Sequence, residues 1–280
     1  MQPAPAGAHR PAHEPMLDVE FAQLSDPGQV RGHNEDYLGY VVPDSPEWAR
    51  THGWLFVLAD GVGGQDRGEV ASRAAVESLL AGFQSAAGAE LLTTLMPRLV
   101  QAANARVLDT ATDAGPGSSM ATTLVACALR FDRAVVAHAG DSRCYLVRRG
   151  HATALTRDHT FANEQVRLGL LSAKEAAESP NRHILSRSLG GDLFVGVETS
   201  EHQVYAGDVL LLCSDGLHGS VEASEIAALL SHDADLEKAA QKLVALANQR
   251  EGSDNISVQV IRVRGVERVG MYRGRPYRLR

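Results

Sequence analysis

The chain has 280 residues, of which 44% are apolar and 22% charged, with a formal net charge of −7; this describes a globular protein with a sizeable core and argues against a nucleic-acid partner. Its apolar runs fall far short of the roughly 20 residues that a membrane span needs. The three cysteines form no C-x-x-C pair and the start lacks an apolar signal region, so we expect a cytoplasmic protein without a disulfide scaffold or a thiolate zinc site.

Residues 1–16 are rich in Pro, Ala and His without periodicity and predict a disordered leader. β-branched and aromatic content bounded by turns predicts strands at 19–25, 37–42, 54–60, 122–129, 134–139, 144–148, 194–199, 209–213 and 256–263. Helical spacing predicts helices at 69–81, 90–111, 161–168, 173–177, 223–231 and 236–248. The strands come in runs, which favours packed sheets flanked by helices over regular βαβ winding.

No linker or internal repeat divides the chain between these ends, so we expect one domain over residues 17–265. Residues 266–280 are basic, with Gly and Pro breaks, and are predicted to be a tail outside the core. This tail is either an inert solvated end or a binder of acidic partners or an anionic membrane surface.

Four aspartates stand at the ends of apolar strands or just before one. Asp60 and Asp215 end the runs LFVLAD and VLLLCSD, Asp141 follows AVVAHAG, and Asp254 precedes ISVQV. Three of them adjoin a glycine, which lets the backbone turn and bring a carbonyl close to the same ion. Carboxylates and carbonyls are the ligands of Mg²⁺ and Mn²⁺. Because Asp-Gly is also a common turn dipeptide, spacing alone leaves a turn and a metal site both open.

A second polar element, SDPGQVRGHNEDYLGY, covers residues 25–40. Glu35 and Asp36 are further oxygen donors just before a strand, and Arg31 is a planar cation suited to bidentate phosphate binding. The alternative is a solvated turn in which Arg31 pairs with a nearby carboxylate.

Taken together, the motifs of the chain resemble the metal-dependent serine/threonine protein phosphatases (type 2C, PPM), in their bacterial branch. The motifs, in order, are VRGHNEDY (30–37), ADGVGG (59–64), MATTLVA (120–126), AGDSRCY (139–145), LTRDHT (155–160), SRSLG (186–190), CSDGL (213–217) and SDNISV (253–258). The resemblance implies an α+β fold: a central antiparallel β-sandwich flanked by α-helices on both faces, in four α-β-β-α layers, with a mobile flap at about residues 160–190.

The resemblance also implies a role for each site residue. Asp60 would bridge two Mn²⁺ or Mg²⁺ ions, one of which the Gly61 carbonyl would bind, and Asp215 and Asp254 would ligate the other. Glu35 would contact the centre directly or through water, with Asp36 supporting it. Arg31 would hold the substrate phosphate, and Asp141 would help bind a third, weaker ion. Asn255 is either a supporting group of this centre or a cap at the start of a strand.

The implied reaction is hydrolysis of phosphoserine and phosphothreonine in proteins by a metal-activated water, without a covalent phosphoenzyme. Many eukaryotic members have a histidine after the Asp-Gly pair that can protonate the leaving alcohol, and this chain has Val62 there. The leaving-group acid is therefore open between a metal-bound water, His33 and His159.

The expected partners are phosphorylated proteins, among them a serine/threonine kinase and its targets, and no strong signal of an oligomer appears, so we expect a monomer. Two rival functions keep the fold: an inactive phosphatase-like protein that binds a partner, and a phosphohydrolase of a small molecule or of a partner-switching regulator.

Overall fold

The computed structural model describes residues 17–62, 67–115, 117–232, 234–272 and 275–278. Two five-stranded antiparallel sheets form its centre. The first sheet has the order β1 (Asp18–Asp26), β10 (Ile256–Gly265), β9 (Val209–Cys213), β6 (Arg143–Arg148) and β7 (His151–Ala154). The second has the order β2 (Asp36–Val41), β3 (Trp54–Asp60), β4 (Leu124–Arg130), β5 (Arg133–Ala139) and β8 (Glu198–Gln203).

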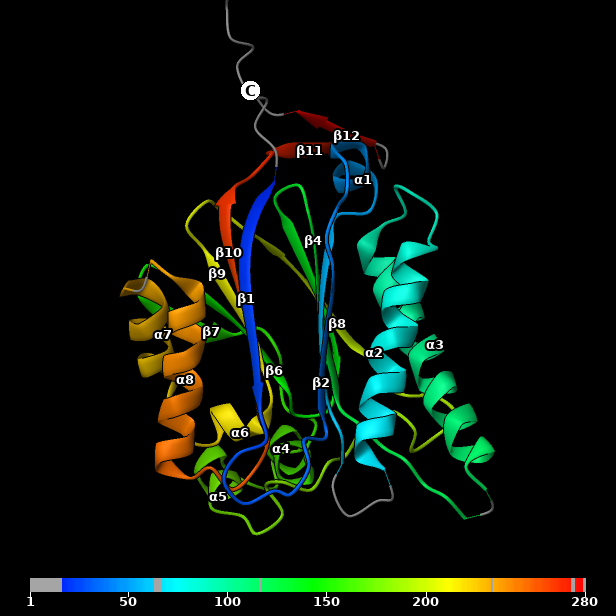
Figure 1. The fold of residues 1–280 in the computed structure, drawn as a ribbon, viewed down its shortest axis with the longest axis vertical. Helices are drawn as coiled ribbons and strands as arrows, with labels where there is room; N and C mark the ends of the chain where they lie inside the picture. Colours follow the sequence, from blue (N-terminus) through cyan, green and yellow to red (C-terminus); the bar gives the residue numbers. More distant parts are fainter. Residues whose placement is uncertain (1–16, 63–66, 116, 233, 273–274, 279–280) are drawn as a thin grey trace, which may run out of the picture.

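Helices cover the outer face of each sheet, as Figure 1 shows. The pair α2 (Gly68–Gln84) and α3 (Leu92–Asp113) packs on the second sheet, and the pair α7 (Ala223–His232) and α8 (Leu236–Arg250) packs on the first. Each pair presents an apolar stripe at helical spacing to the sheet below it. The four-layer α-β-β-α fold implied by the resemblance is therefore confirmed.

The strands β3 and β9 are apolar along almost their whole length because both of their faces are buried. Along β3, Leu55 and Val57 point to the layer under α2 and α3, whereas Phe56 and Leu58 point between the sheets. The same alternation holds along β9, where Leu211 faces the helices and Leu210 the other sheet. A strand with two buried faces has no reason to alternate with polar residues.

One predicted strand, 194–199, is wrong, and the strand there is β8, which starts at Glu198. The preceding residues form a loop that α3 holds: the buried Asn104 amide donates to the carbonyls of Asp192 (2.9 Å) and Leu193 (3.2 Å). Phe194 projects from this loop and is 79% exposed. The apolar content of this segment led to the prediction of a strand, but its backbone carbonyls accept hydrogen bonds from a side chain of α3 instead of from a neighbouring strand. The strand β7 and the short helices α1 (Pro46–Thr51) and α6 (Asp215–His218) were not predicted.

The segment predicted as the flap holds α4 (Phe161–Arg167) and α5 (Ala173–Ala177). Its two ends are joined, because the Phe161 amide donates to the Ile184 carbonyl at 2.9 Å and Thr160 forms a bridge with Leu185. In Figure 1, α4, α5 and α6 gather at one end of the sandwich and α1 lies at the other.

The predicted tail contains a β-hairpin of β11 (Val269–Tyr272) and β12 (Arg275–Arg278), separate from both sheets. Just before it, Val266 packs against the core between the sheets, and the buried Glu267 carboxylate pairs with Arg50 at 3.3 Å. The chain therefore leaves the core a few residues later than expected. The predicted leader, 1–16, lies outside the described residues. Within the part of the chain that the structure describes, every helix is too short or too polar to cross a membrane.

Candidate active site

A cleft of about 640 Å³ opens at the end of the sandwich where α6 and the flap lie. Strands of both sheets deliver carboxylates to it: Asp60 ends β3, Asp141 follows β5, Asp215 follows β9, and Asp254 precedes β10. The predicted site residues that line the cleft are Arg31, Glu35, Asp60, Gly61, Asp141, Asp215 and Asp254. The structure therefore brings together residues that are up to 223 positions apart in the sequence.

Asp36 is the predicted site residue that does not line this cleft. It starts β2 directly opposite Asp60 in the register of the sheet and is buried. The Ser214 hydroxyl donates to its Oδ2 at 2.8 Å, while its Oδ1 has no hydrogen-bond partner. Asp36 thus lies beneath the carboxylates of the cleft, in a supporting position.

Gly61 is held in a place that leaves no room for a side chain. Its amide donates to the Glu35 carbonyl at 3.1 Å, and a Cβ there would lie 2.4 Å from the backbone of Gly68. The Gly61 backbone can therefore approach its neighbours closely, as a carbonyl ligand would need.

Two threonines of the MATT motif fix the backbone of Asp60, and sequence reasoning assigned them no role. The Thr122 hydroxyl donates to the Asp60 carbonyl at 2.8 Å, and the Asp60 amide donates to Thr123 Oγ1 at 3.1 Å. Thr123 Oγ1 also shares a 2.7 Å hydrogen bond with Ser142 Oγ, next to Asp141. These hydroxyls link the ends of β3, β4 and β5, so the backbones of Asp60 and Asp141 are held relative to each other.

Asn255 proves to be a brace of the loop that carries Arg31 and Glu35. Its buried amide donates to the carbonyls of Pro27 and His33, both at 3.0 Å, and its Oδ1 accepts the Glu35 amide at 2.8 Å. The side chain therefore does more than cap the start of β10, and it belongs to the support of the cleft.

Arg31 reaches into the cleft and is paired there. Its guanidinium donates to Asp254 Oδ2 at 2.7 Å, and both side chains are partly exposed. The other oxygen of Asp254, Oδ1, accepts the amide of Asn255 at 2.9 Å. A phosphate in the cleft would therefore compete with the Asp254 carboxylate for this arginine.

Burial and mutual repulsion perturb the carboxyl groups of the cleft. Burial, reinforced by the charge of Asp215, raises the pKa of Asp141 to about 8. Burial, reinforced by Asp254, raises the pKa of Asp215 to about 6. The pKa of Asp60 lies well above its ordinary value because the group is buried and stands near Asp36, Asp215 and other acids. Such a set favours the bound proton or a bound cation.

The donor set therefore fits divalent cations. It consists of hard oxygen atoms. Among the described residues that line the cleft, one side chain is a lysine or arginine, and this is Arg31. Within the described part of the chain, no three of these carboxylates bring their oxygens within 4.8 Å of one another. They line one cleft without meeting at a single point.

The backbone of the segment after β5 accepts a hydrogen bond from a histidine that sequence reasoning did not single out. His218, in the motif DGLHG, donates from Nε2 to the Asp141 carbonyl at 2.9 Å. Gly140, with a φ of 113°, supplies the left-handed backbone that turns the chain toward Asp141. The position of His218 three residues after Asp215 was the available sequence signal.

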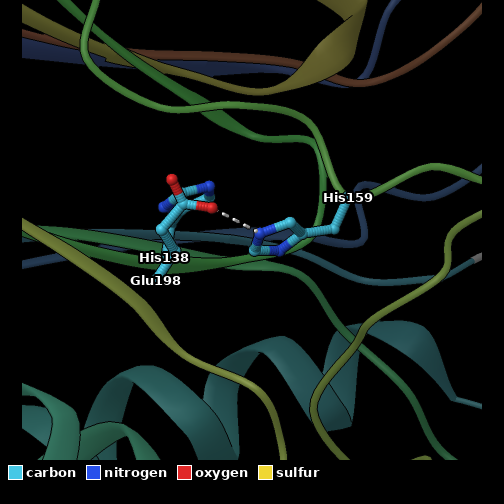
Figure 2. A group of neighbouring side chains, drawn as sticks. All are labelled: His138, His159 and Glu198. Carbon is cyan, nitrogen blue, oxygen red and sulfur yellow. Dashed lines mark hydrogen bonds and ion pairs between the residues drawn. The ribbon is translucent and has the colours of Figure 1, made fainter. Parts of the chain in front are cut away.

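His159, a candidate for the leaving-group acid, lies away from the cleft in a cluster with His138 and Glu198 (Figure 2). It is 2% exposed. Its Nδ1 accepts the Gly140 amide at 3.2 Å, and its Nε2 lies 3.3 Å from Glu198 Oε2. His159 therefore fixes the Gly140 peptide and has no access to a substrate.

This cluster does not have the geometry of a metal site. The rings of His138 and His159 are stacked, with centroids 4.5 Å apart and planes 10° apart. An ion at a bonding distance of about 2.1 Å must lie near the plane of each ligating ring, and two nearly parallel, separate planes share no such point. The Arg187 guanidinium also lies 3.2 Å from His159 Nε2, where an ion would need the lone pair.

Cysteine chemistry is excluded by burial. All three cysteines are buried, and burial raises the pKa of Cys213 to about 12. A thiol of this kind is not a nucleophile at neutral pH.

Comparison with known proteins agrees with the fold and the family resemblance. The family model described as "Protein phosphatase 2C" matches residues 31–258. A serine/threonine phosphatase stp of Listeria innocua is 34% identical over 262 residues, covering 92% of this chain and 99% of the relative. The S. agalactiae serine/threonine phosphatase superposes with a TM-score of 0.79 at 33% identity, over 88% of this chain and all of that one. The catalytic domain of the phosphatase PstP, solved with two manganese ions, gives 0.73 at 32% identity, over 89% and 99%.

The fold and the acidic cleft define a metal-dependent phosphohydrolase. The chain belongs to the protein phosphatase 2C family, as its motifs implied. It is an enzyme that removes phosphate from serine and threonine side chains of proteins in a metal-dependent reaction.

Proposed function

We propose that the cleft holds two divalent cations, Mn²⁺ or Mg²⁺, at Asp60, Gly61, Asp215 and Asp254. Asp60 would serve both ions, the Gly61 carbonyl would serve one of them, and Asp215 and Asp254 the other. Glu35, which lines the same cleft, would contact the pair directly or through a water. The observation that carries this assignment is the convergence of these oxygen donors from both sheets on one cleft. The two manganese ions of the related PstP structure support it.

The ions, when bound, lower the pKa of a water so that it can attack phosphorus, and they neutralise charge on the phosphoryl oxygens. The residues of the chain do the rest. Arg31 exchanges Asp254 for the substrate phosphate and holds its oxygens. Asp36, buried under Asp60, keeps that carboxylate in place through the paired strands β2 and β3. We place a third, weaker ion at Asp141, which lines the same cleft just after β5.

We propose that the substrates are phosphorylated proteins, including a serine/threonine kinase and its targets, and that the enzyme acts as a monomer in the cytoplasm. Residues 17–265 would form the catalytic domain, with residues 160–190 as a flap over the cleft. The Leu168 and Leu170 side chains of this flap are 62% and 68% exposed, which supports contact with a protein substrate.

The decisive experiment measures hydrolysis of a phosphothreonine peptide in Mn²⁺, in chelator, and after Asp60→Asn. We expect turnover in Mn²⁺ and a loss of at least about 100-fold in the other two conditions, because the substitution removes a carboxylate that both ions share. Asp44→Asn, at an exposed aspartate near α1 at the other end of the sandwich, is the matched control and should keep full activity. Activity that survives both chelator and Asp60→Asn would overturn the metal assignment.

The rival functions are separated by the substrate panel. Phosphoserine, phosphothreonine and phosphotyrosine peptides are compared with small phosphate esters under the same conditions. A preference for small esters would favour a small-molecule phosphohydrolase, and inactivity toward all of them would favour a binding protein.

A further inference from the structure

The leaving group of this reaction needs a proton that the residues described so far do not supply. Cleavage of a phosphoserine or phosphothreonine ester leaves an alkoxide, which is a strong base and a poor leaving group. A side chain that donates a proton as the P–O bond breaks contributes typically 10²–10⁴-fold to such a step. Val62 follows the Asp60-Gly61 pair, and its side chain has no acidic proton to donate.

The two histidines considered from the sequence are poorly placed. His159 is buried, with both ring nitrogens engaged outside the cleft. His33 is exposed but is not among the residues that line the cleft, and its carbonyl is held by Asn255.

A third histidine, His183, does line the cleft, together with the carboxylates. Burial, with the charge of Asp254, raises the pKa of Asp215, and His183 opposes that rise. The imidazole therefore lies close enough to the Asp215 carboxyl group for their charges to interact. Among the described residues that line this cleft there is one histidine, and it is His183.

The backbone around His183 is anchored although the side chain is exposed. The Ile184 amide donates to the Asn181 carbonyl at 3.2 Å, and the Ile184 carbonyl accepts the Phe161 amide at 2.9 Å. Two residues further on, the Ser186 amide donates to the His159 carbonyl at 2.8 Å. The flap thus returns to the cleft along a fixed path, and the exposed imidazole can regain a proton from solvent after each turnover.

We propose that His183 is the general acid that protonates the departing serine or threonine oxygen; this role rests on the cation and phosphate site proposed above. The oxygen of a water forms the new bond to phosphorus, and the bond from phosphorus to the side-chain oxygen breaks with its electron pair on that oxygen. The imidazolium proton of His183 goes to this oxygen, which leaves as an alcohol. The attacking water gives up its proton to solvent, inorganic phosphate is released, and solvent returns a proton to the imidazole, so that no net proton is gained or lost by the enzyme.

The test compares two leaving groups in single-turnover kinetics at saturating Mn²⁺. His183→Gln should slow hydrolysis of a phosphothreonine peptide by about 100-fold, the lower end of the range for general acids. The same variant should hydrolyse p-nitrophenyl phosphate within about 3-fold of the wild-type rate, because p-nitrophenolate departs without a proton. His151→Gln, at the exposed start of β7 and outside the cleft, is the matched control and should leave both rates unchanged.

Two results would overturn the role of His183. Equal losses with both substrates would make it a positioning residue, and no loss with either would give it no part in the reaction. Titration of His183→Gln with Mn²⁺ should match the wild type, so that a loss of metal is not mistaken for a loss of the acid. Failure of the wild-type enzyme to hydrolyse the peptide would instead refute the proposed site.

Discussion

Removal of the Asn255 side chain tests whether the cleft depends on a braced loop. The amide makes three hydrogen bonds to the 27–35 loop, of 3.0, 3.0 and 2.8 Å, and is 4% exposed. At about 0.5–1.5 kcal/mol for each bond, Asn255→Ala should lower the free energy of unfolding by about 1.5–4.5 kcal/mol. Arg31 and Glu35 lie on the loop that is released, so we also expect kcat/KM for a phosphothreonine peptide to fall about tenfold, equivalent to about 1.4 kcal/mol.

A matched variant separates stability from positioning. Asn104 on α3 is also buried and makes three hydrogen bonds, to the carbonyls of Asp192 and Leu193 and from the Gly190 amide. Asn104→Ala should therefore reduce the stability by a similar amount, measured by urea unfolding, with a much smaller effect on kcat/KM. If Asn255→Ala unfolds at the wild-type urea concentration, the three bonds do not brace the loop. If it is destabilised but fully active, the braced loop does not position Arg31 and Glu35.

Two further predictions concern the charges of the cleft. Arg31→Ala should weaken inhibition by inorganic phosphate by about 10- to 100-fold, the value of a hydrogen bond to a charged group, and leave Mn²⁺ binding measured by calorimetry unchanged; loss of Mn²⁺ would mean that Arg31 supports a metal ligand instead. In chelator, the free energy of unfolding should fall as the pH rises from about 4 to about 8. The pKa values of Asp215, Asp36 and Asp141 are raised in the folded protein to about 6, about 7 and about 8. Over this interval the folded state therefore binds more protons than the unfolded state, and raising the pH favours unfolding. Saturating Mn²⁺ should flatten this dependence, and Asp141→Asn should reduce its slope near pH 7 to 8; a metal-free stability that rises over this interval would contradict the assignment of burial and repulsion.

The electrostatic state of the cleft connects these predictions to function. The fold buries several acids at one end of the sandwich, where each disfavours the charge of the others. This arrangement reduces the stability of the metal-free protein near neutral pH and gives the cleft its affinity for cations. The hydroxyls of Thr122, Thr123 and Ser214 hold the acidic residues without adding charge. The protein is therefore less stable without metal than it would be without these acids, and in return its cation site is already organised before an ion binds.

The sequence by itself determined that packed sheets are flanked by helices, and it marked most of the acidic and basic residues that line the cleft. Buried strands such as β3 and β9 are recognisable because two-sided burial makes them apolar without interruption, and an aspartate at the end of such a run is conspicuous. The order of the motifs added the family, which the comparisons confirm. Asp60 and Asp215 stood out in this way, and the resemblance added Asp254 and the ligand roles before any contact between the three was known.

Only the tertiary structure decided which side chains share the cleft and which merely lie near it in the sequence. Asn255 and His218 bond to backbone atoms more than 70 residues away, and such long-range bonds leave no periodic signal in the sequence. His159 and His183 are both histidines near or within the flap, yet burial removes the first from the substrate and the chain path brings the second to the cleft wall. The loop before β8 was mistaken for a strand for the same reason, because its backbone partners are the side chains of α3. Local composition reports how a segment can fold, whereas the partner that satisfies its polar groups is chosen by packing.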